Sequence, residues 1–262
     1  MPELLEVESY RRLADRTVGR RIRSIDTPDA WYLKGNTAEE LKAAVVGTTV
    51  VATGRRGKLL TLTLGNGRIL GLRFGMTGRL IVDGEAAIDE LVYGARRQNP
   101  GWDRFTMRFG TRREPPGWLT MSDPRRLGGV ELDPDIERLG PDAATISRPQ
   151  LMEALRSAAP VKAALMDQGR IAGLGNLLTD DVLWRAGLAP ARSSNSITGD
   201  ELATLHRAVR ATLRVLARRG GSHTGDLQDE RSRGGHCPRD GAPLRRDQIG
   251  GRTTIWCPVH QR

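Results

Sequence analysis

The feature that most constrains the fold is a change of residue pattern about halfway along the chain. Residues 48–82, TTVVATGRRGKLLTLTLGNGRILGLRFGMTGRLIV, are rich in residues that favour β-strands, and Asn66-Gly67 marks a hairpin turn within them. Further strand-like runs follow at 104–110 and 117–123. The first half of the chain is therefore expected to be mainly β.

The second half has the apolar spacing of helices. In ELATLHRAVRATLRVLARR (201–219) the leucines recur at helical spacing, and the outer face of the expected helix is basic. Together with an amphipathic pattern near the N-terminus, this predicts an α+β fold rather than a single class of element. Helices are expected at residues 3–18, 149–157, 161–167, 176–187 and 199–218.

Two polar segments separate these patterns. LDPDIERLGPDAATISRP (132–149) carries Pro, Asp and Ser and is expected to be a linker. SHTGDLQDERSRGG (222–235) is polar and is expected to be mobile. These changes divide the chain into the regions 2–135, 136–225 and 226–262.

The charge balance indicates a polyanionic partner. The chain has 41 Lys and Arg against 31 Asp and Glu, a formal net charge of +10. Such an excess is most often found in proteins that bind nucleic acid, although a basic protein without such a partner would have the same composition. The sequence has no run long enough for a transmembrane helix and no signal-peptide core, which predicts a cytoplasmic protein without a membrane partner.

The first residues, MPELLEVESY, have two interpretations. Proline and acidic residues suit the first turn of a helix, so Pro2, Glu3 and Glu6 would simply begin one. The chemical interpretation is that removal of Met1 leaves Pro2 with a free secondary amine, which is partly neutral and nucleophilic at physiological pH. Glu3 and Glu6 would then be carboxylates beside that amine.

The C-terminal module, HCPRDGAPLRRDQIGGRTTIWCPVHQR (236–262), has the spacing of a metal site. The pattern C-x2-D…C-x2-H suits a tetrahedral zinc ion. So short a module has little hydrophobic core and needs a cross-link such as a bound metal ion to fold. His236 is a competing ligand, and a metal-free hairpin with two buried thiols is the alternative. The predicted ligands are Cys237, Asp240, Cys257 and His260.

A glycine-rich turn, GLGN (173–176), lies between two expected helices. It would place backbone N–H groups and Asn176 at a helix N-terminus, an arrangement that suits a phosphate. An ordinary turn between two helices is the alternative.

Several separated motifs together resemble one family. They are the Pro-Glu start, RRGK at 55–58, FGMTGRL at 74–80, DPRR at 123–126, the GLGN turn and GRTTIWCP at 251–258. In order and spacing the sequence is similar to the formamidopyrimidine-DNA glycosylase/endonuclease VIII family of base-excision repair enzymes. The resemblance implies an N-terminal helix plus β-sandwich domain over 2–135, a helix-two-turn-helix domain over 136–225 and a zinc-finger hairpin over 226–262.

The resemblance also implies a catalytic set. Pro2 corresponds to the amine that attacks C1′ and forms a Schiff base, and Glu3 to the acid/base residue that assists sugar-ring opening. Glu6 corresponds to a second carboxylate that supports the site, and Lys58 to a hairpin lysine that contacts phosphate near the lesion.

The DNA-binding residues are implied in the same way. Lys162, Asn176 and Arg252 correspond to the phosphate contacts of the helical domain and the zinc hairpin. In the family a Met, an Arg and a Phe fill the gap left by the flipped base, and the residues here are Met76, Arg125 and Leu127.

The implied activity is that of a bifunctional DNA glycosylase and abasic-site lyase, which removes a flipped-out damaged base and cleaves the strand by β/δ-elimination. Its partner would be double-stranded DNA with a damaged base or abasic site, bound in a cleft between the domains. One structural Zn²⁺, a monomer and association with the nucleoid are expected. The alternative is a non-enzymatic damaged-DNA-binding protein on the same scaffold. A zinc-hairpin transcription regulator is disfavoured, because no recognition-helix motif accompanies the hairpin.

The sequence departs from the family pattern at five points. Leu5 stands in place of the usual proline, and Asp240 and His260 in place of two zinc cysteines. Asp181 replaces a glutamate, which predicts the loss of a helix-terminus contact, and Leu127 replaces the intercalating Phe. The chain between RGGS (219–222) and Cys237 is too short for the loop that closes over 8-oxoguanine. This favours oxidised pyrimidines, ring-opened purines or bulkier adducts, without deciding among them.

Overall fold

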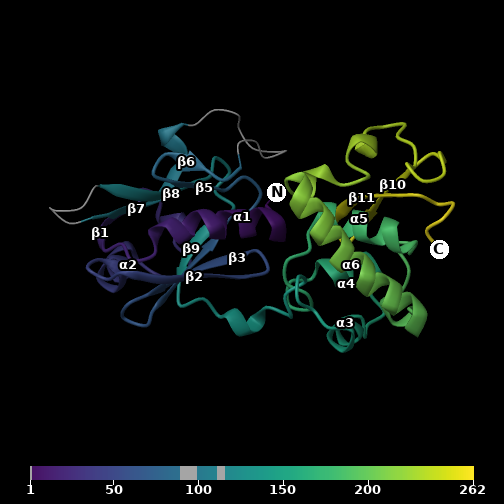
Figure 1. Cartoon of the computed structure of the whole chain (residues 1–262), viewed down its shortest axis with the longest axis horizontal. Coiled ribbons are helices and arrows are strands. Elements are labelled where there is room, and N and C mark those ends of the chain that lie inside the picture. The colour runs from purple at the N-terminus through teal and green to yellow at the C-terminus, as the bar shows by residue number, and fades with distance from the viewer. Residues whose placement is uncertain (1, 89–98, 111–115) are drawn as a thin grey trace. The chain divides into compact units, whose positions relative to one another are not determined.

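The computed structural model describes residues 2–88, 99–110 and 116–262 (Figure 1). The chain forms two compact units. Unit 1 holds Pro2 and Glu6–Ile136, and unit 2 holds Glu3–Leu5 and Glu137–Arg262. The short segment Glu3–Leu5 therefore packs with the second half of the chain, although it lies at the start of the first helix. Among the described helices, none has the combined length and apolarity of a membrane span.

Unit 1 contains two antiparallel sheets and two helices, α1 (Leu4–Ala14, shared with unit 2) and α2 (Ala38–Val45). One sheet has the strand order β1-β7-β8-β5-β6 and the other the order β2-β3-β4-β9. The first is built from β1 (Ile22–Asp26), β5 (Arg79–Val82), β6 (Glu85–Ala86), β7 (Asp103–Phe109) and β8 (Gly117–Ser122). The second is built from β2 (Val50–Arg56), β3 (Leu59–Leu64), β4 (Ile69–Arg73) and β9 (Gly129–Leu132).

One hydrophobic core joins both sheets and α1. It contains Leu62 of β3 and Met121 of β8, packed with Tyr10 of α1 in a single buried cluster. Side chains alternate across a strand, so each sheet contributes one apolar face to this layer. The predicted helix plus β-sandwich is confirmed, and so is the hairpin turn, where Gly67 has a φ of +83°.

Unit 2 consists of helices and one hairpin. Its helices are α3 (Arg148–Ala154), α4 (Val161–Met166), α5 (Asn176–Ala186) and α6 (Gly199–Arg219), and its hairpin is formed by β10 (Arg245–Ile249) and β11 (Arg252–Trp256). The four helices match the predicted ones to within a few residues. A second core cluster fills this unit and includes Leu4 and Leu5 from the start of the chain.

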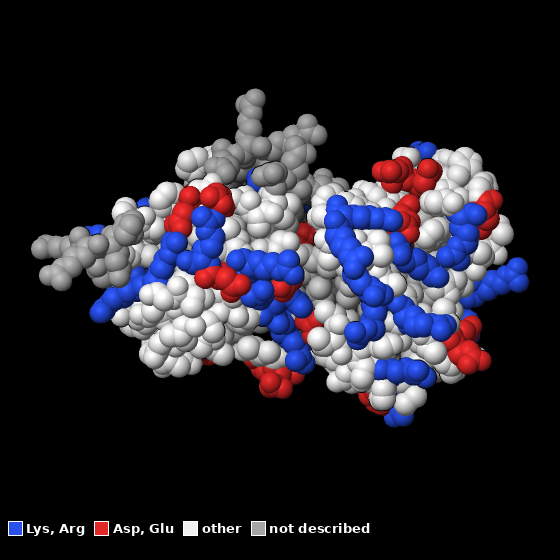
Figure 2. Space-filling model, viewed as in Figure 1, with Lys and Arg blue, Asp and Glu red and all other residues white. Residues whose placement is uncertain are grey.

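Helix α6 shows how local sequence sets an element. Thr198 and Glu201 form a reciprocal capping box at its start, and Gly220 ends it in the left-handed conformation with a φ of +108°. Its apolar face is buried in the core of unit 2. Its outer face carries exposed basic side chains, among them Arg207, Arg210, Arg214 and Arg218. Figure 2 shows Lys and Arg side chains gathered over the part of the molecule where α6 lies.

The segment 222–235 was expected to be mobile, but it is held against α5. It contains two short 3-10 turns, Ser222–Thr224 and Asp229–Arg231. Between them, the N–H groups of Asp226 and Leu227 donate to the buried carboxylate of Asp181 at 3.0 and 3.1 Å. Asp181 therefore anchors this segment. The sequence predicted that an aspartate here would lose a contact at a helix terminus, whereas its carboxylate binds the backbone of residues 226 and 227.

Candidate functional site

The carboxylate of Glu3 lies at the N-terminus of α5. Gly175 N–H donates to Glu3 Oε2 at 2.8 Å, Leu177 N–H to Oε1 at 2.9 Å and Leu178 N–H to Oε2 at 3.1 Å. The side chain of Glu3 is fully buried. The first N–H groups of a helix have no partner within the helix and carry a partial positive charge, so they bind a carboxylate well. They also fix the orientation of Glu3.

The glycines of the GLGN turn make this approach possible. A Cβ atom on Gly175 would lie 2.3 Å from Glu3 Cδ, and one on Gly173 would lie 2.5 Å from Leu4 Cδ1. Leu4 N–H also donates to the carbonyl of Gly173 at 3.1 Å. The turn is thus shaped to receive the first residues of the chain.

This arrangement corrects one expectation. The N–H groups of the GLGN turn were predicted to suit a phosphate, but Glu3 already occupies them. Asn176, the first residue of α5, is partly exposed, and its Oδ1 has no hydrogen-bond partner among the described residues. The anion recognised by this helix N-terminus is therefore part of the protein itself.

Pro2, Glu6 and Lys58 belong to unit 1. Pro2 and Glu6 are buried, and Lys58 is half-buried in the turn between β2 and β3. The turn is tight because Gly57 has a φ of +58°. Arg55 stabilises the turn, because it donates one hydrogen bond to the carbonyl of Gly57 at 2.9 Å and another to the carboxylate of Glu8 of α1 at 3.1 Å. Hydrogen bonds from Arg11 and Arg55 lower the pKa of Glu8 against the opposing effect of its burial, which keeps it charged.

Met76, Arg125 and Leu127 are brought together by two adjoining turns of unit 1. The buried carboxylate of Asp123 accepts a hydrogen bond from Thr77 Oγ1 at 2.6 Å and from Gly128 N–H at 2.8 Å. A Cβ atom on Gly75 would lie 2.4 Å from the backbone of Leu127, so the two turns touch. Arg125 and Leu127 are exposed, Leu127 by 51%, and Met76 is half-buried. Asp123, which lies in the DPRR motif but was given no role, is the residue that joins the turns.

Lys162 does not reach solvent. Its side chain is fully buried, and Nζ lies 2.7 Å from Asp180 Oδ1 of α5. The same ammonium donates to Thr254 Oγ1 at 2.8 Å and to the carbonyl of Thr253 at 3.2 Å, both in β11. Burial lowers the pKa of Lys162, and the charge of Asp180 opposes that shift. This placement argues against the predicted phosphate contact and indicates a structural ion pair.

Asp180 was not predicted as an important residue, yet it joins α5 to the hairpin. Its Oδ2 accepts hydrogen bonds from Arg231 at 2.8 Å and from Ile255 N–H of β11 at 3.2 Å. With Lys162 on Oδ1, both carboxylate oxygens are engaged. The β10–β11 hairpin is therefore held on α5 by buried charged groups. Arg252, the first residue of β11, is exposed after the Gly250-Gly251 turn.

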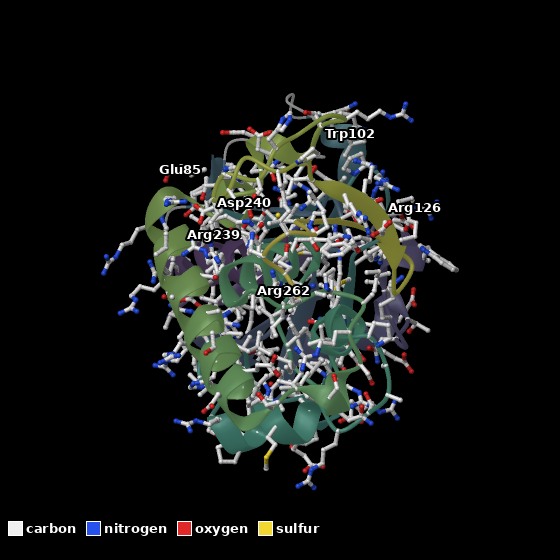
Figure 3. The ribbon with its side chains drawn as sticks, turned by 90° about the vertical axis from the view of Figure 1, so that its right-hand side faces the viewer. Glu85, Trp102, Arg126, Arg239, Asp240 and Arg262 are labelled. Carbon is white, nitrogen blue, oxygen red and sulfur yellow. The ribbon has the colours of Figure 1, made fainter. Side chains whose placement is uncertain are left out.

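The four predicted metal ligands form one cluster. One donor atom from each of Cys237, Asp240, Cys257 and His260 lies within 4.8 Å of all the others. A tetrahedral zinc ion would set a thiolate sulfur and an imidazole nitrogen about 3.6 Å apart. Cys237 Sγ and His260 Nδ1 are 3.6 Å apart, and Cys257 Sγ lies 3.3 Å from Asp240 Oδ2. Asp240 is labelled in Figure 3.

The surroundings of the cluster orient it for metal binding. His260 Nε2 lies 3.2 Å from the carbonyl of Trp184, so a proton there leaves Nδ1 available as a ligand. Trp184 Nε1–H donates to Cys237 Sγ at 3.3 Å, which fixes the position of that sulfur. Burial raises the pKa of the Cys257 thiol, so a thiolate there calls for a neighbouring cation. His236 is exposed and lies outside this cluster, which makes Asp240 the better candidate of the two.

Two family models match the chain. Residues 1–130 match the formamidopyrimidine-DNA glycosylase N-terminal domain, and residues 139–227 match the formamidopyrimidine-DNA glycosylase H2TH domain. Together they span both units and end before the metal cluster.

Curated relatives and solved structures agree with these models. The formamidopyrimidine-DNA glycosylase of Chloroflexus aggregans is 32% identical over 285 residues, covering 100% of this chain and 98% of that protein. That of Paracoccus denitrificans is 33% identical, with 100% of both chains covered. Among structures, the wild-type Lactococcus lactis Fpg in complex with a DNA containing N7-benzyl-Fapy-dG has a TM-score of 0.82 at 28% identity, with 100% of both chains covered. A complex of the Lactococcus lactis Fpg with an abasic-site DNA has a TM-score of 0.81 at 27% identity and covers 100% of both chains.

Proposed function

The chain belongs to the formamidopyrimidine-DNA glycosylase family, and we propose that it is a bifunctional enzyme that excises damaged bases and then cleaves the DNA strand at the resulting abasic site. Pro2, once Met1 is removed, is the nucleophile, and Glu3 is the group that transfers protons. The substrate is duplex DNA with a damaged base or an abasic site, as named for the Lactococcus lactis complexes.

The observation that carries this proposal is the position of Glu3. Three backbone N–H groups hold its buried carboxylate at the start of α5. Hydrogen bonds of this kind favour the ionised form of a carboxylate. Glu3 follows Pro2 directly, so a carboxylate of fixed orientation lies next to the proposed amine. If Glu3 only began a helix, positions 173 and 175 would not need to be glycines that leave room for Glu3 and Leu4.

The proposed reaction begins when the neutral amine of Pro2 attacks C1′ and the bond from C1′ to the base breaks. The base leaves with the electron pair of that bond and takes a proton from water. The new ammonium gives its proton to the carboxylate of Glu3. Glu3 passes that proton to O4′ as the C1′–O4′ bond breaks, and the nitrogen lone pair forms the iminium, or Schiff base. Loss of a C2′ proton then expels the 3′ phosphate, a second elimination expels the 5′ phosphate, and water hydrolyses the iminium to release Pro2.

Cations on both units support DNA binding. Lys58 lies in a turn and Arg252 begins β11 directly after one, where their side chains can bind phosphates, and Asn176 can donate from Nδ2. Met76, Arg125 and Leu127 lie together on two turns tied by Asp123, as a wedge that fills a vacated base position requires. Lys162 is left out of this set because its ammonium is buried against Asp180.

The metal is proposed to be one structural zinc ion held by Cys237, Asp240, Cys257 and His260. When bound, zinc would supply a fold-stabilising cross-link rather than chemistry, because all four positions of its tetrahedron would be filled by protein. The donor set of two sulfurs, one nitrogen and one oxygen fits this ion. The hairpin that carries Arg252 would depend on it.

The preferred lesions are proposed to be oxidised pyrimidines, ring-opened purines or bulkier adducts. The chain between α6 and Cys237 is short, and Asp181 holds part of it against α5. A segment of this length leaves little chain for a loop that would close over a flipped 8-oxoguanine.

Borohydride trapping on a panel of lesion duplexes tests the proposal. The enzyme should form a covalent adduct with the DNA, and mass spectrometry should map the bond to Pro2 in protein that lacks Met1. Pro2→Gly replaces the secondary amine by a primary amine at the same place and should retain some trapping, whereas an N-terminal extension before Pro2 should abolish it. Tight, lesion-selective binding without any adduct would favour a non-enzymatic damaged-DNA-binding protein instead.

A further inference from the structure

Trp31 is the most exposed large hydrophobic side chain among the described residues. It lies in a 3-10 turn, Ala30–Tyr32, and 67% of it is exposed, whereas the adjacent Tyr32 is fully buried. The turn therefore directs one aromatic ring into the core and the other into solvent. A single exposed apolar residue is common on protein surfaces, so the neighbours of Trp31 decide what it means.

The turn that carries Trp31 is fixed beside the turn that carries Leu127. Asp29 accepts hydrogen bonds from Arg126 Nε at 2.6 Å and Nη2 at 2.7 Å, and the N–H of Trp31 donates to the same carboxylate at 3.2 Å. The hydrogen bond from Arg126 holds the pKa of Asp29 below its usual range, so this pair stays charged. Lys34 N–H donates to the carbonyl of Val130 at 2.8 Å.

Two glycines bring the segments into direct contact. A Cβ atom on Gly128 would lie 2.5 Å from the hydroxyl of Tyr32, and one on Gly129 would lie 2.6 Å from Cε of Lys34. Residues 29–34 and 126–130 therefore form one surface, which we call the Trp31 surface. Its large exposed apolar side chains are Trp31 and Leu127.

The charged groups that reach solvent on the Trp31 surface, the half-buried Lys34 and the exposed Arg126, are cationic. Lys34 Nζ lies 4.9 Å from the centre of the Trp31 ring, and Arg126 is exposed beside Leu127. The one acidic group, Asp29, is buried and neutralised by Arg126. An aromatic ring among cations is the arrangement on which nucleic-acid bases stack while phosphates bind nearby. Two apolar side chains are too few for a stable protein interface, which buries more than about 1,000 Å².

We propose that Trp31 is a DNA-binding residue whose ring packs against a base of the strand that Arg125 and Leu127 contact. This inference rests on the proposed function, which assigns those two residues to DNA. Lys34, on its flexible stem, turns from the ring to a phosphate when a base takes its place. Trp31, in an adjacent turn, then supplies the aromatic ring that is absent at Leu127, where the family has an intercalating Phe.

The test compares Trp31→Ala with Trp118→Ala, measuring affinity for a duplex that carries a stable abasic-site analogue by fluorescence anisotropy. Trp118 is a second exposed tryptophan of unit 1, 38% exposed, at the start of β8, whereas the Trp31 surface follows the end of that strand. Loss of one base stack should weaken binding by about 5- to 100-fold in Trp31→Ala. Trp31→Phe should recover most of the affinity, and Trp118→Ala should stay within about twofold of the parent.

Two further measurements separate stacking from other effects. Trp31→Ala should leave the melting temperature and the salt dependence of binding unchanged, because the ring is exposed and uncharged, whereas Lys34→Ala should lower the salt slope by about 0.9. Parental affinity in Trp31→Ala, with the parent binding normally, would overturn this inference and leave the proposed function intact. A parent protein that binds no duplex would overturn the proposed function first, and the inference with it.

Discussion

Replacing Lys162 by Met separates two assignments of this residue. If Lys162 contacts a DNA phosphate, its loss should weaken binding without unfolding the protein. If it is the buried partner of Asp180, as its 2.7 Å contact indicates, its loss should destabilise unit 2. Methionine keeps much of the length and apolar volume of the lysine stem but cannot satisfy the carboxylate.

The expected magnitude follows from the contacts of Asp180. Removing one member of a buried ion pair destabilises a protein by about 3–5 kcal/mol, because the other charge stays buried without its partner. Asp180 Oδ2 would still accept from Arg231 and from Ile255 N–H, so the lower end, about 3 kcal/mol, is appropriate. For a unit of this size that lowers the melting temperature by roughly 10 °C.

The assay pairs thermal unfolding with the salt dependence of DNA binding, and Arg252→Ala is the matched control. Lys162→Met should lower the melting temperature and leave the slope of log K against log[salt] nearly unchanged at a temperature where the protein is folded. Arg252→Ala should lower the slope by about 0.9 and leave the melting temperature unchanged, because its side chain is exposed. A Lys162→Met variant with parental stability and a slope reduced by one unit would refute the buried-pair assignment.

Three other perturbations have definite expected outcomes. Glu3→Gln should retain DNA binding but lose base excision in single-turnover assays, because an amide cannot accept and return the proton; excision at the parental rate would remove Glu3 from the mechanism. Metal analysis of Cys257→Ser should show the loss of bound zinc, and this variant should bind DNA more weakly because its Arg252 hairpin is loosened. Asp240→Ala should also lose zinc and His236→Ala should keep it; the opposite result would make His236 the fourth ligand. The hydrogen-bonded ion pair with Arg192 lowers the pKa of Glu201 from its usual 4.5 to about 2, so its stabilising effect is present above about pH 4.5 and is lost as the pH falls towards 2. Glu201→Gln should flatten the acid-unfolding profile in that range, and an unchanged profile would contradict this assignment.

The sequence predicted the elements well because their causes are local. Capping boxes, a glycine stop and the spacing of leucines determine α6 within its own residues. The change from β to helical patterns separates the sheets from the helices in the same way. The spacing of Cys237, Asp240, Cys257 and His260 likewise predicted a cluster, because the hairpin between the pairs returns on itself.

The sequence failed where a buried charge has a distant partner. It assigned the GLGN turn to a phosphate because it could not show that Glu3, more than 170 positions away, fills the site. Lys162 was assigned to a DNA phosphate through the family resemblance, which could not show that its partner Asp180, in another helix, holds it in the core. A signal for the Lys162 pair was available in α5, where Asp180 and Asp181 lie between the apolar residues Leu177-Leu178 and Val182-Leu183. Acidic residues are buried in such a position only when they are paired.

Helix α5 links the candidate catalytic residue to the metal cluster within unit 2. Its first N–H groups hold Glu3, its middle carboxylates hold Lys162 and the 226–227 segment, and Trp184 near its end contacts both Cys237 and His260. Because Lys162 and Ile255 tie β11 to the same helix, loosening of the hairpin need not reach the N-terminus of α5. Metal loss should therefore reduce DNA affinity through Arg252 much more than it reduces the trapping of an already bound abasic site. An equal loss of affinity and of trapping at saturating DNA would mean instead that α5 transmits the disturbance to Glu3.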